Sequence, residues 1–146
     1  MKIAAPSRPW RGTRDTDHYG SGVFLASRDG GSRAHMGRDF IALAGDEAIF
    51  PIHAVIERVG LAYDGWQLGS IHLKGIKEHQ GITMKLLYAS CDHPTGTEGN
   101  MGDPLGVVQD LQKKYPGITN HIHVEAWVAS DPYLLMADIP SGGPVV

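Results

Sequence analysis

Short apolar or alternating runs, separated by glycine, proline, asparagine and aspartate, extend along most of the chain. Runs of this length with β-branched and aromatic residues between turn residues are typical of strands. The predicted strands cover residues 23–26, 40–44, 48–52, 54–59, 70–74, 82–89, 105–111 and 121–128. Pro51 interrupts one run, as an edge or a bend would. A short terminal helix is predicted after residue 129, with Ser130 or Asp131 as its N-cap and Pro132 in its first turn. The pattern therefore predicts an all-β, antiparallel fold with minor helix and long loops.

The length of the chain favours one folded domain. Its 146 residues are enough to bury a hydrophobic core. Residues 1–17 are polar, contain Pro6 and Pro9, and are predicted to form an irregular N-terminal arm. The domain is expected over residues 18–140 and a flexible tail over 141–146. The sequence shows no internal repeats and no heptads.

Composition narrows the classes of partner. A formal net charge of −3 gives no electrostatic basis for binding nucleic acid or an anionic membrane. The single cysteine, Cys91, excludes an internal disulfide framework. No apolar run at the N-terminus predicts a signal peptide, and no run is long enough for membrane insertion. We therefore expect synthesis in the cytoplasm, with access to the periplasm or cell wall through lysis or a secretion or injection system.

Two short histidine motifs carry the candidate chemistry: His35-Met-Gly-Arg-Asp39 and His121-Ile-His123. Residues two or four apart on an extended backbone project from the same face. His35 and Asp39 are therefore expected to point the same way, as are His121, His123 and Glu125. Three ligands drawn from His35, Asp39, His121 and His123 would leave a fourth tetrahedral position open, which is typical of a catalytic Zn²⁺ site. Nickel, cobalt and iron remain alternatives by ligand type.

The order of these motifs resembles that of the lysostaphin-type zinc endopeptidases, which cut peptide cross-links in bacterial cell walls. The resemblance covers about residues 18–128 and includes the intervening Gly102-Asp103 turn. It implies that His35, Asp39 and His123 hold Zn²⁺ and that His121 is the catalytic histidine. It also implies that peptidoglycan cross-bridges are the substrate.

One branch of this superfamily, the leukocyte cell-derived chemotaxins, is similar in finer detail. The similar segments are 17–22, 111–118, 121–125 and 130–132. That branch keeps the zinc ligands but is not regarded as proteolytic, and it depends on disulfides that a lone Cys91 cannot form. The resemblance, together with the missing disulfides, predicts a bacterial or phage-type relative that shares the backbone details of this branch.

One position departs from the pattern of the active peptidases. They carry a second catalytic histidine in a Tyr-x-His motif, where this chain has Tyr88-Ala-Ser90. A serine can donate a hydrogen bond but cannot hold a positive charge, and the loss of one acid–base group costs about 10²–10⁴ in rate. Candidates to orient a ligand or to border the groove are Glu125, Ser90, Tyr88, His72 and His93.

Three functions fit these observations. The first is a zinc endopeptidase that cuts peptidoglycan cross-links, as a cell-wall lysin or an injected antibacterial effector. The second is a catalytically impaired zinc-binding module that binds cell wall or a protein partner. The third is a β-rich domain without a metal, as part of a larger assembly.

Overall fold

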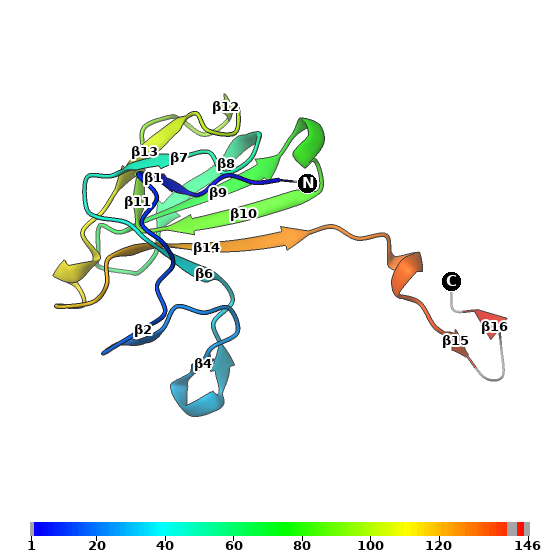
Figure 1. Cartoon of the computed structure of the whole chain (residues 1–146). Helices are drawn as coiled ribbons and strands as arrows, with labels where there is room; N and C mark the ends of the chain where they lie inside the picture. The colour runs from blue at the N-terminus through cyan, green and yellow to red at the C-terminus, as the bar shows by residue number, and fades with distance from the viewer. Residues whose placement is uncertain (1, 140–142, 145–146) are drawn as a thin grey trace.

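Two antiparallel sheets form the body of the protein in the computed structural model, which describes residues 2–139 and 143–144 (Figure 1). The larger sheet has the strand order β12-β8-β9-β10-β14-β6, and the smaller has the order β1-β7-β13-β11. The strands of the larger sheet are β12 (Glu98–Gly99), β8 (Ala54–Leu61), β9 (Gly69–Gly75), β10 (Ile82–Leu87), β14 (His121–Val128) and β6 (Arg38–Ile41). Those of the smaller sheet are β1 (Ser7–Arg8), β7 (Glu47–Ile49), β13 (Pro104–Val108) and β11 (Ala89–Cys91).

Small hairpins and short 3-10 helices make up the remaining regular structure. The hairpin strands are β2 (Thr16–Asp17), β3 (Gly20–Ser21), β4 (Ser27–Arg28), β5 (Arg33–Ala34), β15 (Asp138–Ile139) and β16 (Gly143–Pro144). The 3-10 helices are η1 (Asp29–Gly31), η2 (Lys77–His79), η3 (Leu111–Lys113) and η4 (Pro132–Leu135). Within the described ranges, no helix is long and apolar enough to cross a membrane.

Apolar side chains from both sheets pack into one main core. On β10, alternate residues are buried, which follows from the period of two in its sequence. Ile71, Leu86 and Ile122 of the large sheet and Leu105 of the small sheet are all fully buried in the same cluster. This shared core fixes β14, and therefore His121 and His123, against the rest of the molecule.

Most of the predicted strands are present, and the fold class is confirmed. The strand over residues 121–128 has the predicted bounds. The prediction for residues 23–26 is wrong, because this segment is a turn in which Leu25 has a φ of 63°. The run 82–89 is not continuous either: Tyr88, with a φ of 76°, separates β10 from β11 and directs the chain from the large sheet to the small one.

The N-terminal segment differs from the predicted irregular arm. Ser7 and Arg8 pair with β7, and Thr13 forms a bridge with Phe40. Arg14 is only 4% exposed. Residues 2–17 therefore pack against the domain predicted to begin at residue 18, because they pair with its strands and bury a charged side chain in it.

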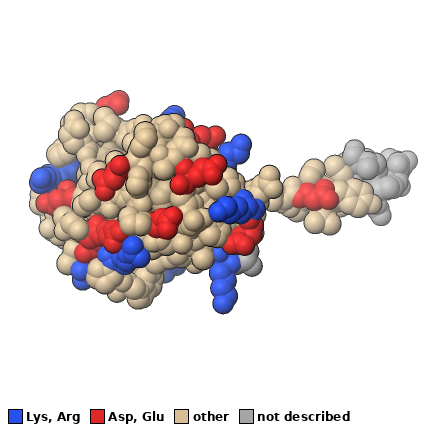
Figure 2. Space-filling model, turned by 90° about the horizontal axis from the view of Figure 1, so that it is seen from above, with Lys and Arg blue, Asp and Glu red and all other residues tan. Residues whose placement is uncertain are grey.

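The C-terminal segment projects away from the body after β14 (Figures 1 and 2). It contains η4, with Asp131 as N-cap, so the predicted terminal helix is a single 3-10 turn. The tail predicted over residues 141–146 lies largely outside the described residues. On the face shown in Figure 2, acidic and basic residues are interspersed.

Candidate metal centre

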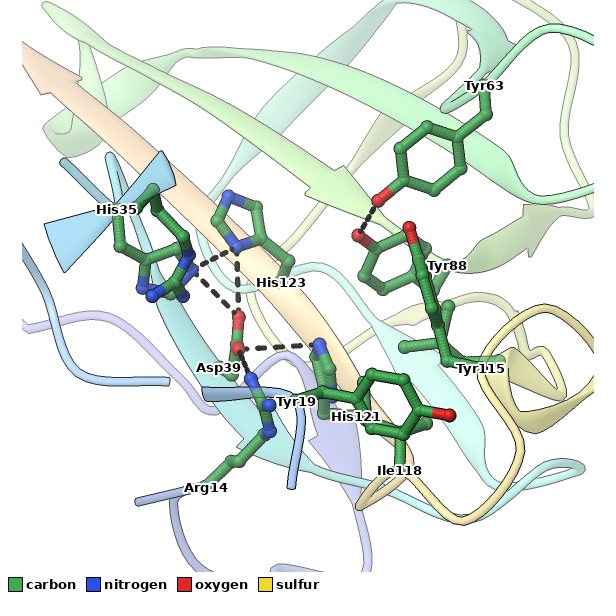
Figure 3. A pocket seen from close by; sticks show the side chains of 12 residues that line it. Arg14, Tyr19, His35, Asp39, Tyr63, Tyr88, Tyr115, Ile118, His121 and His123 are labelled. Atoms are coloured by element: carbon green, nitrogen blue, oxygen red, sulfur yellow. Dashed lines mark hydrogen bonds and ion pairs between the residues drawn. The ribbon is translucent and has the colours of Figure 1, made fainter. Parts of the chain in front are cut away.

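Three side chains from the two histidine motifs meet at one point (Figure 3). His35 Nε2 lies 2.9 Å from His123 Nδ1 and 3.2 Å from Asp39 Oδ1, and His123 Nδ1 lies 2.9 Å from Asp39 Oδ1. Ligand atoms at about 2.0–2.2 Å from a tetrahedral zinc ion are roughly 3.3 Å apart. The three donor atoms therefore have nearly the spacing that one such ion needs.

The register between β14 and β6 brings two of these ligands together. His123 lies directly opposite Asp39 in the antiparallel pair. Gly37, in the middle of the first motif, passes close to β14: a Cβ atom there would lie 2.7 Å from His123 Cε1. The glycine of the motif is therefore required by this close approach, since any side chain would collide with a ligand ring.

His35 reaches the centre from outside the strand. It follows β5 and precedes β6, and its side chain converges with that of Asp39 as expected, although residues 35–37 are not part of a strand. Its backbone N–H donates to Ala26 O, and its Nδ1 lies 2.9 Å from Val23 O. The turn over residues 23–26 thus holds the His35 ring, because it supplies the carbonyl groups that anchor it.

His123 is oriented by a carboxylate on its far side. Its Nε2 lies 3.1 Å from Glu125 Oε1, and Lys85 Nζ lies 3.4 Å from the other oxygen of Glu125. Although burial opposes it, the carboxylates of Asp39 and Glu125 raise the pKa of His123. The position of Glu125 agrees with its predicted role, because a carboxylate on the distal nitrogen fixes the tautomer of a ligand histidine.

The hydrogen bonds of the two imidazoles indicate that a cation belongs between them. His35 Nδ1 faces a carbonyl oxygen and His123 Nε2 faces a carboxylate, so in the neutral form of each ring these nitrogens carry the proton. The other nitrogens, His35 Nε2 and His123 Nδ1, then direct lone pairs at each other and at Asp39. Three lone-pair donors this close repel one another unless a positive charge lies among them, so the residues fit a divalent metal such as Zn²⁺.

His121 lies beside this centre, but its ring donates its hydrogen bond to the backbone. Its Nδ1 donates to Thr119 O at 2.7 Å, which leaves Nε2 unprotonated, 3.4 Å from Asp39 Oδ2. Burial lowers its pKa, and its side chain is 4% exposed. His121 is therefore a neutral base with its free nitrogen directed at the centre, which is the geometry that general-base catalysis needs.

Arg14 is a site residue that the sequence did not reveal. Its Nη1 donates to Asp39 Oδ2 at 2.8 Å, while Nε and Nη2 donate to Asp17. Although burial opposes it, contacts with the surrounding histidines and Arg14 lower the pKa of Asp39. Arg14 thus occupies one oxygen of Asp39 and leaves Oδ1 for the metal. No motif marks it, because it lies in a polar segment 25 residues before its partner.

An open pocket of about 210 Å³ covers the centre, and tyrosines form much of its wall. Tyr19, Tyr63, Tyr88 and Tyr115 line it together with the metal cluster and His121 (Figure 3). Tyr88 was predicted to border the groove, and it does. Its positive φ is costly for a bulky residue, roughly 1–3 kcal/mol, and strain of this kind is concentrated at functional sites.

Three other candidate residues do not line this pocket. Ser90 donates to Val107 O at 3.3 Å in the small sheet, because the bend at Tyr88 has already moved the chain off the large sheet. His72 lies 3.1 Å from Arg58 Nη2, and His93 lies 2.9 Å from Pro104 O. The structure therefore gives these three residues no contact with the metal cluster.

A second histidine cluster lies apart from this pocket and has a different bonding pattern. His53, Glu78 and His79 could also surround an ion by distance alone. His53 Nδ1 accepts from Met101 N–H and its Nε2 donates to Glu78, while His79 Nδ1 accepts from His53 N–H and its Nε2 donates to Lys2 O. All four ring nitrogens have protein partners, so this cluster is a hydrogen-bonded structural unit.

Comparison with known sequences identifies relatives of the whole domain, although no family model matches the chain. Leukocyte cell-derived chemotaxin-2 of Mus musculus is 32% identical over 123 residues, which cover 82% of this chain and 76% of the mouse protein. Myeloid protein 1 of Gallus gallus is 32% identical over 135 residues, which cover 89% of this chain but only 39% of the chicken protein.

Solved structures with the same fold include peptidases. Lysostaphin aligns with a TM-score of 0.58 at 18% identity, over 75% of this chain and 44% of lysostaphin. A zinc-containing peptidase from Vibrio cholerae aligns with a TM-score of 0.53 at 15% identity, over 88% of this chain and 36% of that protein. This chain therefore belongs to the family of leukocyte cell-derived chemotaxin-2, and it shares its fold with lysostaphin.

Proposed function

We propose that this protein is a zinc-dependent endopeptidase that cuts the peptide cross-links of peptidoglycan. The observation that carries the proposal is the convergence of three lone-pair donors on one point, with the neutral base His121 beside it in an open pocket. A purely structural zinc site is closed by a fourth protein ligand, whereas a catalytic site keeps one position open.

His35, Asp39 and His123 would hold the ion, and a bound zinc ion supplies Lewis-acid polarisation of the scissile carbonyl and activation of water. His121 Nε2 accepts the proton of the attacking water, because its Nδ1 is already committed to Thr119 O. Arg14 and Glu125 hold Asp39 and His123 in place through their outer atoms. The open pocket suits an extended peptide, such as a glycine-rich or D-amino-acid bridge.

The test is digestion of purified peptidoglycan by the zinc-loaded protein, with mass spectrometry of the fragments and measurement of newly freed amino groups. We expect cleavage by the wild type and a decrease of about 10²–10⁴ in rate for His121→Ala, since general-base catalysis contributes that much. His93→Ala is the matched control, because this half-buried histidine contacts Pro104 outside the pocket and its loss should leave the rate unchanged. If the wild type frees no amino groups from any cross-link chemistry, the enzymatic proposal is wrong.

One observation favours a second candidate function, a zinc-dependent binding module without catalysis. Ser90 faces the small sheet and offers the pocket no acid–base group, and the matched relatives include a chemotaxin. Such a module would sediment with peptidoglycan, or bind a protein partner, only when zinc is present, and it would release no fragments. If Ser90→His confers cleavage on an inactive wild type, the protein is a lapsed enzyme.

A further inference from the structure

We propose that the paired hydroxyls of Tyr88 and Tyr63 form the oxyanion-stabilising donor of the active site, with Tyr88 as the catalytic residue. This inference rests on the proposed peptidase function and names the group that would assist the metal in that reaction. Tyr88 Oη and Tyr63 Oη lie 2.6 Å apart on the wall of the metal pocket, and both hydroxyls point toward it in Figure 3.

A count of the protons shows that this pair has one O–H donor that is not used between the two hydroxyls. Two hydroxyls carry two protons but share one hydrogen bond, so one O–H is left over. Among the described residues, neither hydroxyl of this pair has a carboxylate or carbonyl acceptor, so the remaining proton is available to a ligand.

Arg14, Arg28 and Tyr19, which also line the pocket wall, each donate to protein acceptors. Arg14 donates to Asp39, Asp17 and Gly20 O, and Arg28 donates to two backbone carbonyls. The Tyr19 hydroxyl donates to Pro116 O at 2.7 Å. The Tyr63–Tyr88 pair and Tyr115 therefore remain as neutral donors of the described wall, and of these Tyr88 is the one whose ring meets His121.

The backbone places Tyr88 where this role requires it. Its N–H donates to Gly69 O and its carbonyl accepts from Gln109 N–H, which holds the residue at the junction of the two sheets. Its ring then meets His121 edge-on, with centroids 5.4 Å apart. A strained, buried and doubly anchored tyrosine next to the general base is a rigid donor, and rigid donors stabilise developing charge most effectively.

The proposed step balances as follows. The water oxygen forms a bond to the carbonyl carbon, the carbonyl π pair moves to the carbonyl oxygen, and the water proton passes to His121 Nε2. The Tyr88 O–H stays with Tyr88 and donates a hydrogen bond that strengthens as the carbonyl oxygen becomes negative. Burial raises the pKa of Tyr88, so the phenol remains a neutral donor throughout.

The test uses a synthetic peptide that contains the bond whose cleavage the digestion assay identifies, and its phosphinate isostere, whose tetrahedral oxygens mimic the reacting carbonyl. We expect Tyr88→Phe to lower kcat about 10²-fold, the magnitude for one oxyanion donor, and to weaken phosphinate binding by the same factor. Its KM and zinc content should stay within twofold of wild type. Tyr63→Phe should lower kcat and phosphinate affinity about tenfold each. This variant also tests the proposal if Tyr88→Phe does not fold.

Tyr19→Phe is the matched control, because its hydroxyl is engaged with Pro116; its ratio of phosphinate to peptide affinity should equal that of wild type. If wild type cleaves and binds the phosphinate tightly while both tyrosine variants match it, the donor role is wrong and the proposed function stands. Equal loss of peptide and phosphinate affinity would show a merely structural role. If wild type neither cleaves nor prefers the phosphinate, the proposed function fails and the donor role fails with it.

Discussion

The part of the chain that the structure describes holds two clusters of two histidines and one carboxylate, and they differ in what their ring nitrogens face. In the cluster of His53, Glu78 and His79, each ring nitrogen has a complementary partner. In the cluster of His35, Asp39 and His123, two ring nitrogens, His35 Nδ1 and His123 Nε2, have hydrogen-bond acceptors. The other two, His35 Nε2 and His123 Nδ1, direct lone pairs at each other. Both clusters have the same residue types and ligand atoms within 4.8 Å of one another, so the direction of the protons separates a metal site from a structural unit.

The clusters also differ in how the fold supports them. The three members of the metal centre are at most 8% exposed, and its outer partners come from separate segments: the turn over residues 23–26, the N-terminal segment and β14. In the second cluster, Glu78 is 70% exposed and lies in solvent. A carboxylate in water gains little from one ion pair, whereas a buried one must be paired or bound to a metal.

The largest expected effect is the loss of one ligand. His35→Ala should weaken zinc binding by more than the roughly 100-fold that loss of an outer partner of a ligand costs, because two ligands cannot replace three. His53→Ala should leave zinc affinity unchanged. Competition with a chromophoric chelator measures both. The assignment of zinc binding to the first cluster is wrong if His53→Ala loses zinc or if His35→Ala keeps the zinc affinity of the wild type.

His79→Ala tests whether the second cluster has a structural role. The side chain is 1% exposed, and its loss leaves His53 N–H and Lys2 O without partners. We expect a decrease of about 2–4 kcal/mol in the free energy of unfolding, from the cavity and the unsatisfied groups, with one zinc per chain retained. Urea denaturation of the zinc-loaded protein tests this. A fall in zinc content without a loss of stability would reverse the assignment of the two clusters.

Two carboxylates provide a matched pair of smaller changes. Glu125 and Glu78 each accept from the Nε2 of a histidine, at 3.1 and 2.7 Å. Glu125→Gln should weaken zinc binding about 10–100-fold, because His123 loses its orienting acceptor. Glu78→Gln should change neither zinc affinity nor stability by more than about 1 kcal/mol. Equal effects of the two substitutions on zinc affinity would mean that the outer contact of His123 has no special role.

The sequence predicted the fold class and the convergence of the two motifs, because alternation along 121–128 and a three-ligand set are local signals. It could not predict Arg14, whose role depends on a contact across 25 residues of polar chain. It also named Ser90 as a candidate for the groove. This error comes from the backbone bend at Tyr88, where a non-glycine residue adopts positive φ against its intrinsic preference. The domain boundaries and the peptidoglycan substrate stay predictions.

The smallest effect concerns the proton that competes with the metal. In the metal-free protein the pKa of His123 is raised, so this histidine still holds a proton somewhat above its ordinary value of about 6.5. Zinc binds the neutral form and must displace that proton, so the affinity falls as pH decreases through this pKa. The zinc-dependent increase in stability should therefore shrink by about 1.4 kcal/mol, or tenfold in affinity, per pH unit of acidification. Thermal unfolding with and without zinc between pH 8 and pH 6 measures this decrease.

In the Glu125→Gln variant the decrease should begin at a lower pH, because one of the two carboxylates that raise the pKa of His123 has become neutral. An unchanged onset in that variant would mean that Glu125 does not set the protonation of His123.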